Sequence, residues 1–143
     1  MSNTSKFQPE KIDLLISGGV IVTLNKDNCI LNKGSIAIDK TKIIGVGDSN
    51  TLDKEYAPKI KIESEGFVVM PGLINIHGHA SNSLIRGLGK DLSLNNWLEK
   101  VCWPIMDRAD DEDLYNGVIL SCTEQILNGI TTFADMWAGV GIS

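Results

Sequence analysis

The chain has 143 residues but only two histidines and three cysteines, and aromatic residues make up 6% of it. The cysteines, Cys29, Cys102 and Cys122, are far apart and form no CxxC pair. A disulfide framework and a thiolate metal site are therefore both disfavoured. We expect reduced, mostly buried thiols in a cytoplasmic protein.

Long apolar runs and basic clusters are also missing. No apolar run approaches the roughly 20 residues that cross a bilayer, and the N-terminus, MSNTSKFQPEK, is too polar for a secretory signal. The net charge is -5, and Lys and Arg are scattered singly. Membranes and nucleic acids are therefore excluded as partners.

The first half of the chain predicts a small antiparallel β module. The composition, 43% hydrophobic and 22% charged, is that of a globular protein with a core. Short apolar stretches alternate with turn signals such as Gly18-Gly19. The predicted strands are residues 12–25, 34–38, 42–47, 59–62 and 67–70.

Pro71-Gly72 marks a boundary, after which the pattern changes. LINIHGH, residues 73–79, is apolar at almost every position, which suits a strand covered on both faces. A loop over residues 80–93 should follow. A helix is then predicted over residues 94–103, with Ser93 as N-cap and Pro104 as its limit or a kink.

A second helix is predicted over residues 111–128, with Asp110 or Asp111 as its N-cap. Gly129 suits the left-handed residue that ends a helix, and ITTFADM, residues 130–136, reads as another buried strand. Leu73 to Met136 thus has the order of a βαβ-type unit. The helix carries an apolar stripe that needs a partner, formed by Leu114, Val118, Cys122 and Ile126. Two such strands cannot cover their own edges, which is typical of a sequence cut off within a larger fold.

The two histidines are one residue apart at the end of the strand over residues 73–79. Side chains alternate along a strand, so His77 and His79 project from the same face. Two ring nitrogens at that spacing can converge on one metal ion. The alternative is that both are polar residues at a strand end, hydrogen-bonded or solvated.

The sequence VMPGLINIHGHA, with SLIRGL, DLSLNNWLEKVCWPI and NGITTFADM, resembles the opening of a metal-dependent amidohydrolase. The resemblance is to the branch of adenosylhomocysteine and methylthioadenosine deaminases, cytosine-deaminase-like enzymes and triazine chlorohydrolases. It runs from Ile12 and is most specific over residues 69–136. It implies an α/β fold, with a β-sandwich portion in residues 1–70. Residues 71–143 would then hold about two strands of an incomplete (β/α)8 TIM-type barrel.

The resemblance implies the N-terminal portion of a hydrolase acting on non-peptide C–N bonds. The parent enzyme would deaminate or dechlorinate a purine, pyrimidine, pterin or triazine with hydroxide generated on a divalent metal. His77 and His79 would be ligands to zinc, or to iron or manganese. The other ligands and all catalytic residues would come from strands that this chain lacks, so the chain alone should be inactive. Asp135 is a possible third ligand, but a carboxylate that hydrogen-bonds loop amides is favoured.

Three further residues bear on the substrate. Trp97 either lines the substrate mouth, as in relatives, or is a core aromatic. Met106 stands where nucleoside-specific relatives have the acid of P-I-E, and a thioether cannot bind a ribose diol by charge-assisted hydrogen bonds. Arg86 either contacts an anion or lies near a helix C-terminus, which we favour.

Gly78 replaces the threonine that relatives have between the histidines.

Two rival interpretations remain. One is the enzyme fragment just described, and the other is a non-catalytic truncated remnant that misfolds or associates with another chain. In either case we expect homo-oligomers or aggregation through exposed strand edges.

Overall fold

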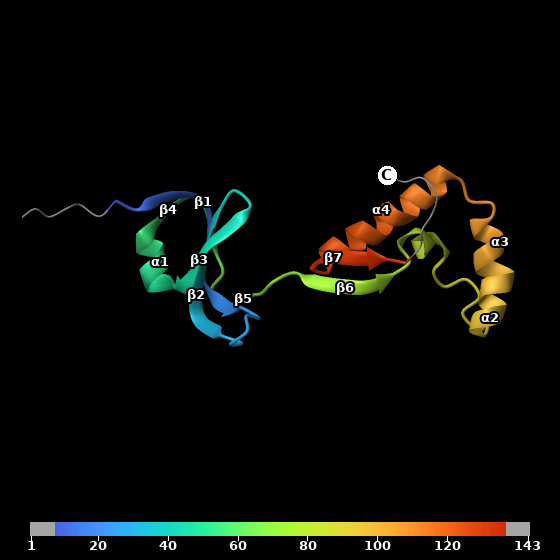
Figure 1. Cartoon of the computed structure of the whole chain (residues 1–143), viewed down its shortest axis with the longest axis horizontal. Coiled ribbons are helices and arrows are strands. Elements are labelled where there is room, and N and C mark those ends of the chain that lie inside the picture. The colour runs from blue at the N-terminus through green and yellow to red at the C-terminus, as the bar shows by residue number, and fades with distance from the viewer. Residues whose placement is uncertain (1–7, 137–143) are drawn as a thin grey trace, which may run out of the picture. The chain divides into compact units, whose positions relative to one another are not determined.

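The computed structural model describes residues 8–136, and the chain divides between Pro71 and Gly72 into two compact units. Figure 1 shows a sheet with one helix in the first unit, and two strands with several helices in the second. Each unit has its own arrangement of strands.

Unit 1 is a five-stranded sheet in which β1 (Glu10–Val22) is central. The order is β3-β2-β1-β4, formed with β2 (Ile30–Asp39), β3 (Lys42–Asp48) and β4 (Tyr56–Glu63), while β5 (Val68–Val69) also pairs with β1. The β1–β2 and β2–β3 pairs are antiparallel, but β1 pairs with β4 and β5 in parallel. The prediction of an antiparallel module is therefore wrong for the β1–β4 and β1–β5 pairs.

The parallel pairing depends on a helix that the sequence reading missed. This helix, α1 (Ser49–Glu55), leads from β3 at one edge of the sheet to β4 at the other edge. Its N-cap is Asp48, whose side chain accepts a hydrogen bond from the Asn50 amide at 2.9 Å. Because α1 crosses over the sheet, the next strand can run parallel to β1, which a tight hairpin would not allow.

The core of unit 1 lies between α1 and one face of the sheet. It consists of Ile12, Leu15, Ala37 and Leu52, with Tyr56 packed against it. The opposite face is also apolar, as the paired residues Ile16 and Ile62 illustrate. Ile62 remains 47% exposed because α1 covers only one side.

A carboxylate holds this unit together at the helix–sheet junction. The hydroxyls of Ser17 and Ser35, 2% and 0% exposed, donate to Asp53 of α1 at 2.7 and 2.8 Å. Lys61 of β4 pairs with the same carboxylate at 3.0 Å. Partial burial acts to raise the pKa of Asp53, but these three partners together lower that pKa below its usual value.

We predict that Asp53→Ala lowers the free energy of unfolding by about 2 kcal/mol, because two buried hydroxyls lose a charged acceptor. A carboxylate with a lowered pKa in the folded state stabilises fully above its unfolded pKa of about 3.9. The contribution is lost as the pH falls through the lower folded pKa. Urea unfolding should therefore show a difference between wild type and variant that is largest near neutral pH and shrinks in acid.

The matched control is Asp27→Ala, in the exposed loop between β1 and β2, which should leave the unfolding curve unchanged. A deficit in Asp53→Ala that stays constant into strong acid would contradict the role given to the ionised carboxylate.

Unit 2 has the predicted order of strand, helices and strand. The strands β6 (Leu73–Gly78) and β7 (Ile130–Asp135) pair in parallel. Between them lie the 3₁₀-helix η1 (Ala80–Ile85), α2 (Leu94–Trp97), a π-helical segment η2 (Leu98–Cys102), α3 (Trp103–Met106) and α4 (Asp111–Leu127). The βαβ-type arrangement is thus confirmed, while the loop expected over residues 80–93 begins with η1 instead.

The helix predicted over residues 94–103 continues to Met106. Ser93 has the extended conformation of an N-cap, but its hydroxyl accepts from the side chain of Asn96 rather than from a backbone amide. Pro104 does not end the helix, because the wider π turn precedes it. Such a turn accommodates the missing N–H and the ring of a proline within a helical run.

The ends of α4 are as predicted. Asp110 is the N-cap and forms a reciprocal capping box with Asp113. Gly129 follows the helix with a φ of +78°, the left-handed conformation that favours glycine.

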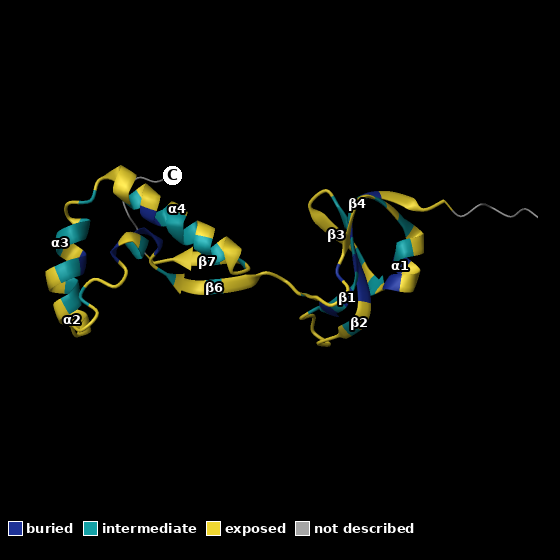
Figure 2. Cartoon of the chain, turned by 180° about the vertical axis from the view of Figure 1, so that it is seen from behind, coloured by how far each residue is buried: buried dark blue, intermediate teal, exposed yellow. Residues whose placement is uncertain are grey.

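Several apolar residues of unit 2 are exposed, and Figure 2 colours the exposed residues yellow. Ile76 on β6 is 81% exposed, so the expectation that this strand is covered on both faces is wrong for the described residues. At the end of the helical stripe, Ile126 is 70% exposed and its neighbour Leu127 is 80% exposed. The two strands and α4 therefore leave apolar surface without cover from residues 8–136.

The thiols differ in exposure. Cys102 is buried and Cys122 half-buried, but Cys29 is exposed, so the expectation of burial is wrong for Cys29. Cys29 lies just before β2, in a loop where its amide donates to the side chain of Asn25.

Within residues 8–136, no helix is long and apolar enough to span a bilayer.

Candidate metal and substrate site

The two histidines lie at the carboxyl end of β6. His77 is in the strand, and His79 is the residue that immediately precedes η1. Their ring centroids are 5.1 Å apart with the ring planes at 82°. The alternation of the strand thus brings the two rings together, although β6 ends at Gly78.

The strand segment before His77 is tied to α4. The Asn75 side chain accepts from the His77 amide at 3.2 Å and donates to Gln125 at 3.3 Å. Gln125 in turn donates to the hydroxyl of Ser121, one helical turn earlier. These bonds fix the strand backbone from which His77 projects.

The pair of imidazoles fits a metal ion chemically. Both residues are exposed, and imidazole nitrogens are good ligands for zinc and similar ions. With ring centroids 5.1 Å apart, the two rings are close enough for a nitrogen of each to reach the same ion. Within residues 8–136, no group of three or more His, Cys, Asp or Glu side chains is arranged to hold a metal.

Asp135 lies at the end of β7, opposite Gly78 in the parallel pair. Its carboxylate accepts a hydrogen bond from the Ala80 amide at 3.4 Å, immediately after His79. This contact is the one expected of a carboxylate that hydrogen-bonds loop amides.

Trp97 and His79 line the same cavity, which has a volume of about 390 Å³. The Trp97 indole N–H donates to the Leu88 carbonyl at 2.8 Å. Gly89, with a φ of +63°, packs so closely on the Trp97 ring that an added Cβ would lie 3.2 Å from it. Trp97 thus forms a fixed wall of the cavity and also anchors its helix to the preceding loop.

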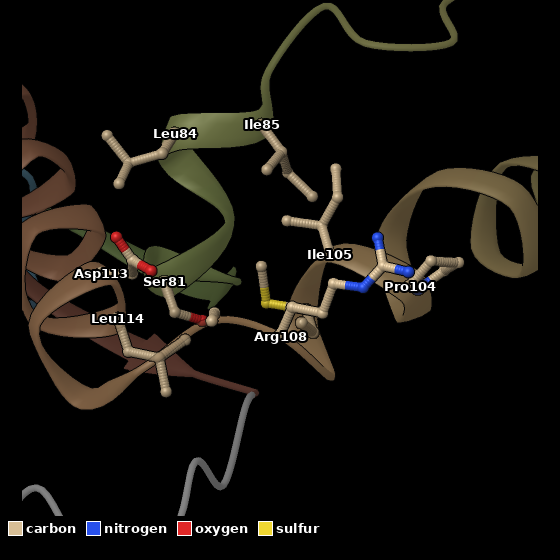
Figure 3. A pocket seen from close by; sticks show the side chains of 10 residues that line it. Ser81, Leu84, Ile85, Pro104, Ile105, Arg108, Asp113 and Leu114 are labelled. Carbon is tan, nitrogen blue, oxygen red and sulfur yellow. The ribbon is translucent and has the colours of Figure 1, made fainter.

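Met106 lines a different cavity, of about 300 Å³. Its wall is largely apolar, with Leu84, Ile85, Ile105 and Leu114 (Figure 3). Ile85 borders both cavities. Trp97 and Met106, which the sequence reading assigned to one substrate site, therefore lie in neighbouring cavities.

Arg86 forms a two-pronged ion pair that sequence reasoning did not find. Its two terminal nitrogens donate to the two oxygens of Glu124 on α4, both at 2.8 Å. Its Nε donates to the Ser83 carbonyl at 3.2 Å, which agrees with the expected place near a helix C-terminus. The hydrogen bonds between the two side chains, together with their opposite charges, raise the pKa of Arg86 and lower the pKa of Glu124.

Gly117 is another residue that the sequence reading missed. It is buried in α4, where the helix meets η1. A Cβ at this position would lie well inside van der Waals contact with the Ser81 carbonyl oxygen. Only glycine lets α4 approach η1 this closely.

The sequence profile described as the amidohydrolase family matches residues 68–141, more than half of the chain. The chain belongs to the amidohydrolase family. The resemblance noted from HGH and its neighbouring motifs is thereby confirmed.

Two relatives illustrate the match within the family. A 5-methylthioadenosine/S-adenosylhomocysteine deaminase from Pelotomaculum thermopropionicum is 37% identical over 87% of this chain and 29% of its own length. A 5'-deoxyadenosine deaminase from Methanosarcina mazei is 41% identical over 87% of this chain and 28% of its own length. The chain thus spans less than a third of the length of these relatives.

Solved structures show the same correspondence. A zinc-bound adenosine deaminase from Xanthomonas campestris matches with a TM-score of 0.87 and 28% identity, over 91% of this chain and 30% of that one. An atrazine chlorohydrolase from Arthrobacter aurescens in complex with zinc matches with a TM-score of 0.73 and 28% identity, over 85% of this chain and 28% of that one. The mixed α/β fold is therefore that of the N-terminal part of amidohydrolase barrels, as predicted.

We predict that Gly117→Ala lowers the free energy of unfolding by about 1 to 3 kcal/mol, the usual cost of overpacking. The added methyl group must push η1 away from α4, which should also raise the rate of amide hydrogen exchange in η1. Urea unfolding and hydrogen exchange measure the two effects.

Asn116→Ala, an exposed neighbour on the same helix, is the control and should change neither measurement. Wild-type stability in Gly117→Ala would show that α4 and η1 are not in the close contact described.

Proposed function

We propose that this chain supplies the first part of a metal-dependent hydrolase that removes an amino group, or a comparable leaving group, from a nitrogen heterocycle. The observation that carries the proposal is the pair of imidazoles, 5.1 Å apart, at the carboxyl end of β6. In barrel enzymes, active groups gather at the carboxyl ends of the strands. Residues 1–70 would be the β-sandwich portion and residues 71–143 the first βα units of the barrel.

His77 and His79 would be ligands to a divalent metal. Zinc is the first candidate because two of the matching solved structures contain it, and iron or manganese are alternatives. A bound zinc ion would lower the pKa of a water molecule to about 7 and so supply a nucleophile. Catalytic zinc ordinarily has three protein ligands, so the missing ligand and the proton-transfer groups would lie outside residues 8–136.

The remaining side chains would place the substrate. The heterocycle would lie in the cavity that His79 and Trp97 share, against the fixed face of the indole. The neighbouring cavity with Met106 is largely apolar and would take an alkyl substituent, while Arg108 and Asp113 on its wall are the groups that could bind a hydroxyl. The Asp135 carboxylate, which accepts a hydrogen bond from the Ala80 amide, would keep the backbone after His79 in place.

The exposed apolar surface supports a second candidate function. Ile76 and Leu127 are 81% and 80% exposed, a pattern typical of surfaces that associate. A non-catalytic chain could bury them against a second copy or another protein. Such a chain would form oligomers without any requirement for metal.

We predict that zinc binds the chain through the two histidines. His77→Ala and His79→Ala should each weaken zinc binding by more than about tenfold, since removing a ligand should cost at least as much as removing a group that supports one. Equilibrium dialysis with metal analysis measures the affinity. Cys29→Ser is the control, because this exposed thiol could otherwise bind zinc by itself. Equal affinity in wild type and both histidine variants would refute the assignment.

We predict that the polypeptide encoded by the complete reading frame releases ammonia or chloride from heterocycles. The panel is 5'-deoxyadenosine, S-adenosylhomocysteine, cytosine, a pterin and a chlorotriazine. His79→Ala should lower kcat/KM by on the order of a thousandfold through loss of the metal. Met106→Glu should shift the ratio of kcat/KM values toward ribonucleosides by about tenfold, because it adds an acceptor for hydroxyls. A metal-loaded protein inactive on the whole panel would favour the second candidate.

A further inference from the structure

The candidate metal ligand and an ion pair lie at opposite ends of one short helix. His79 is the N-cap residue of η1, and Arg86 is its C-cap residue. Within this segment the Asn82 amide donates to the His79 carbonyl at 3.1 Å, and the Ser83 hydroxyl donates to the Ala80 carbonyl at 2.8 Å. Because these bonds hold the segment in one conformation, a shift of Arg86 would be transmitted to His79.

Arg86 is held in a fixed orientation. Both terminal nitrogens contact Glu124 at 2.8 Å, and Nε contacts the Ser83 carbonyl. A planar guanidinium bound at two oxygens is fixed in both distance and direction, which a lysine would not achieve.

The same turn of α4 also holds the other side of the histidine pair. Gln125, next to Glu124, accepts from Asn75, and Asn75 accepts from the His77 amide. Glu124 and Gln125 therefore position the chain before His77 and after His79. One turn of α4 therefore contacts the chain on both sides of the histidine pair.

We expect the Arg86–Glu124 ion pair to contribute little to the free energy of unfolding. The side chains of Arg86 and Glu124 are 61% and 42% exposed, so solvent screens their attraction. A loss of the pair should therefore be seen in local geometry and not in the unfolding transition. Metal ligands require placement to within fractions of an ångström, so local geometry is where the effect matters.

We propose that Glu124 is a positioning residue that, through Arg86 and η1, sets the place of His79 relative to His77. The consequence for metal affinity rests on the proposed function, but the geometry itself can be tested without metal.

The test compares Glu124→Gln with the control Glu112→Gln, which removes a charge from the exposed first turn of the same helix. The chain has only two histidines, so its side-chain NMR spectrum holds two sets of imidazole resonances, assigned with His77→Ala. Glu124→Gln should shift the His79 resonances, speed amide exchange over residues 83–90 and weaken zinc binding by about tenfold. Its urea midpoint should equal that of wild type, and Glu112→Gln should change none of these quantities.

The charge exchange Arg86→Glu with Glu124→Arg restores the pair in the opposite direction. The double variant should recover most of the zinc affinity and the wild-type His79 resonances. Arg86→Lys keeps the charge but not the two-pronged contact, so its zinc affinity and His79 resonances should both differ from those of wild type. Unchanged His79 resonances in Glu124→Gln, or no recovery in the exchanged double variant, would overturn the proposal. If wild type binds no zinc, the proposed function fails, and the His79 resonances still decide whether Glu124 positions that ring.

Discussion

The parallel pairing of β6 with β7 is the constraint on which the candidate site depends. Two parallel strands need a long crossover, and here α4 returns the chain so that both carboxyl ends meet at one edge. That edge brings His77, His79 and Asp135 into one neighbourhood, although Asp135 is more than 50 residues further along the chain. Without the pairing, the histidines would be two polar residues at the end of an isolated strand.

The features that could be predicted from the sequence are those set by local rules. Period-two alternation placed His77 and His79 close together, and capping preferences placed the start of α4 at Asp110 or Asp111 and its end before Gly129. The family motifs identified the fold. Each of these signals lies within a few consecutive residues.

The features that could not be predicted depend on contacts between distant residues. The Arg86–Glu124 pair joins positions 38 apart in the chain, and no local pattern indicates it. The role of Gly117 could not be predicted from the sequence, because it depends on the close approach of η1 to α4. The parallel β1–β4 pairing was missed because the helix α1 went unrecognised, although Asp48 carries an ordinary N-cap signal. The exposure of Ile76 could not be predicted because an apolar run indicates that a strand needs cover but not which residues supply it, and residues 8–136 do not.

The central place of β1 in unit 1 has a consequence for how this unit folds. Glu10 pairs with Tyr56 and Ser17 with Glu63, so the β1–β4 ladder links residues 46 positions apart. Hairpins such as β2–β3 can close early, but the edge of β1 that faces β4 waits until the chain through Glu63 has left the ribosome. During that interval a strand rich in isoleucine and leucine presents free backbone groups, so the nascent unit is most open to mispairing or chaperone capture at this stage.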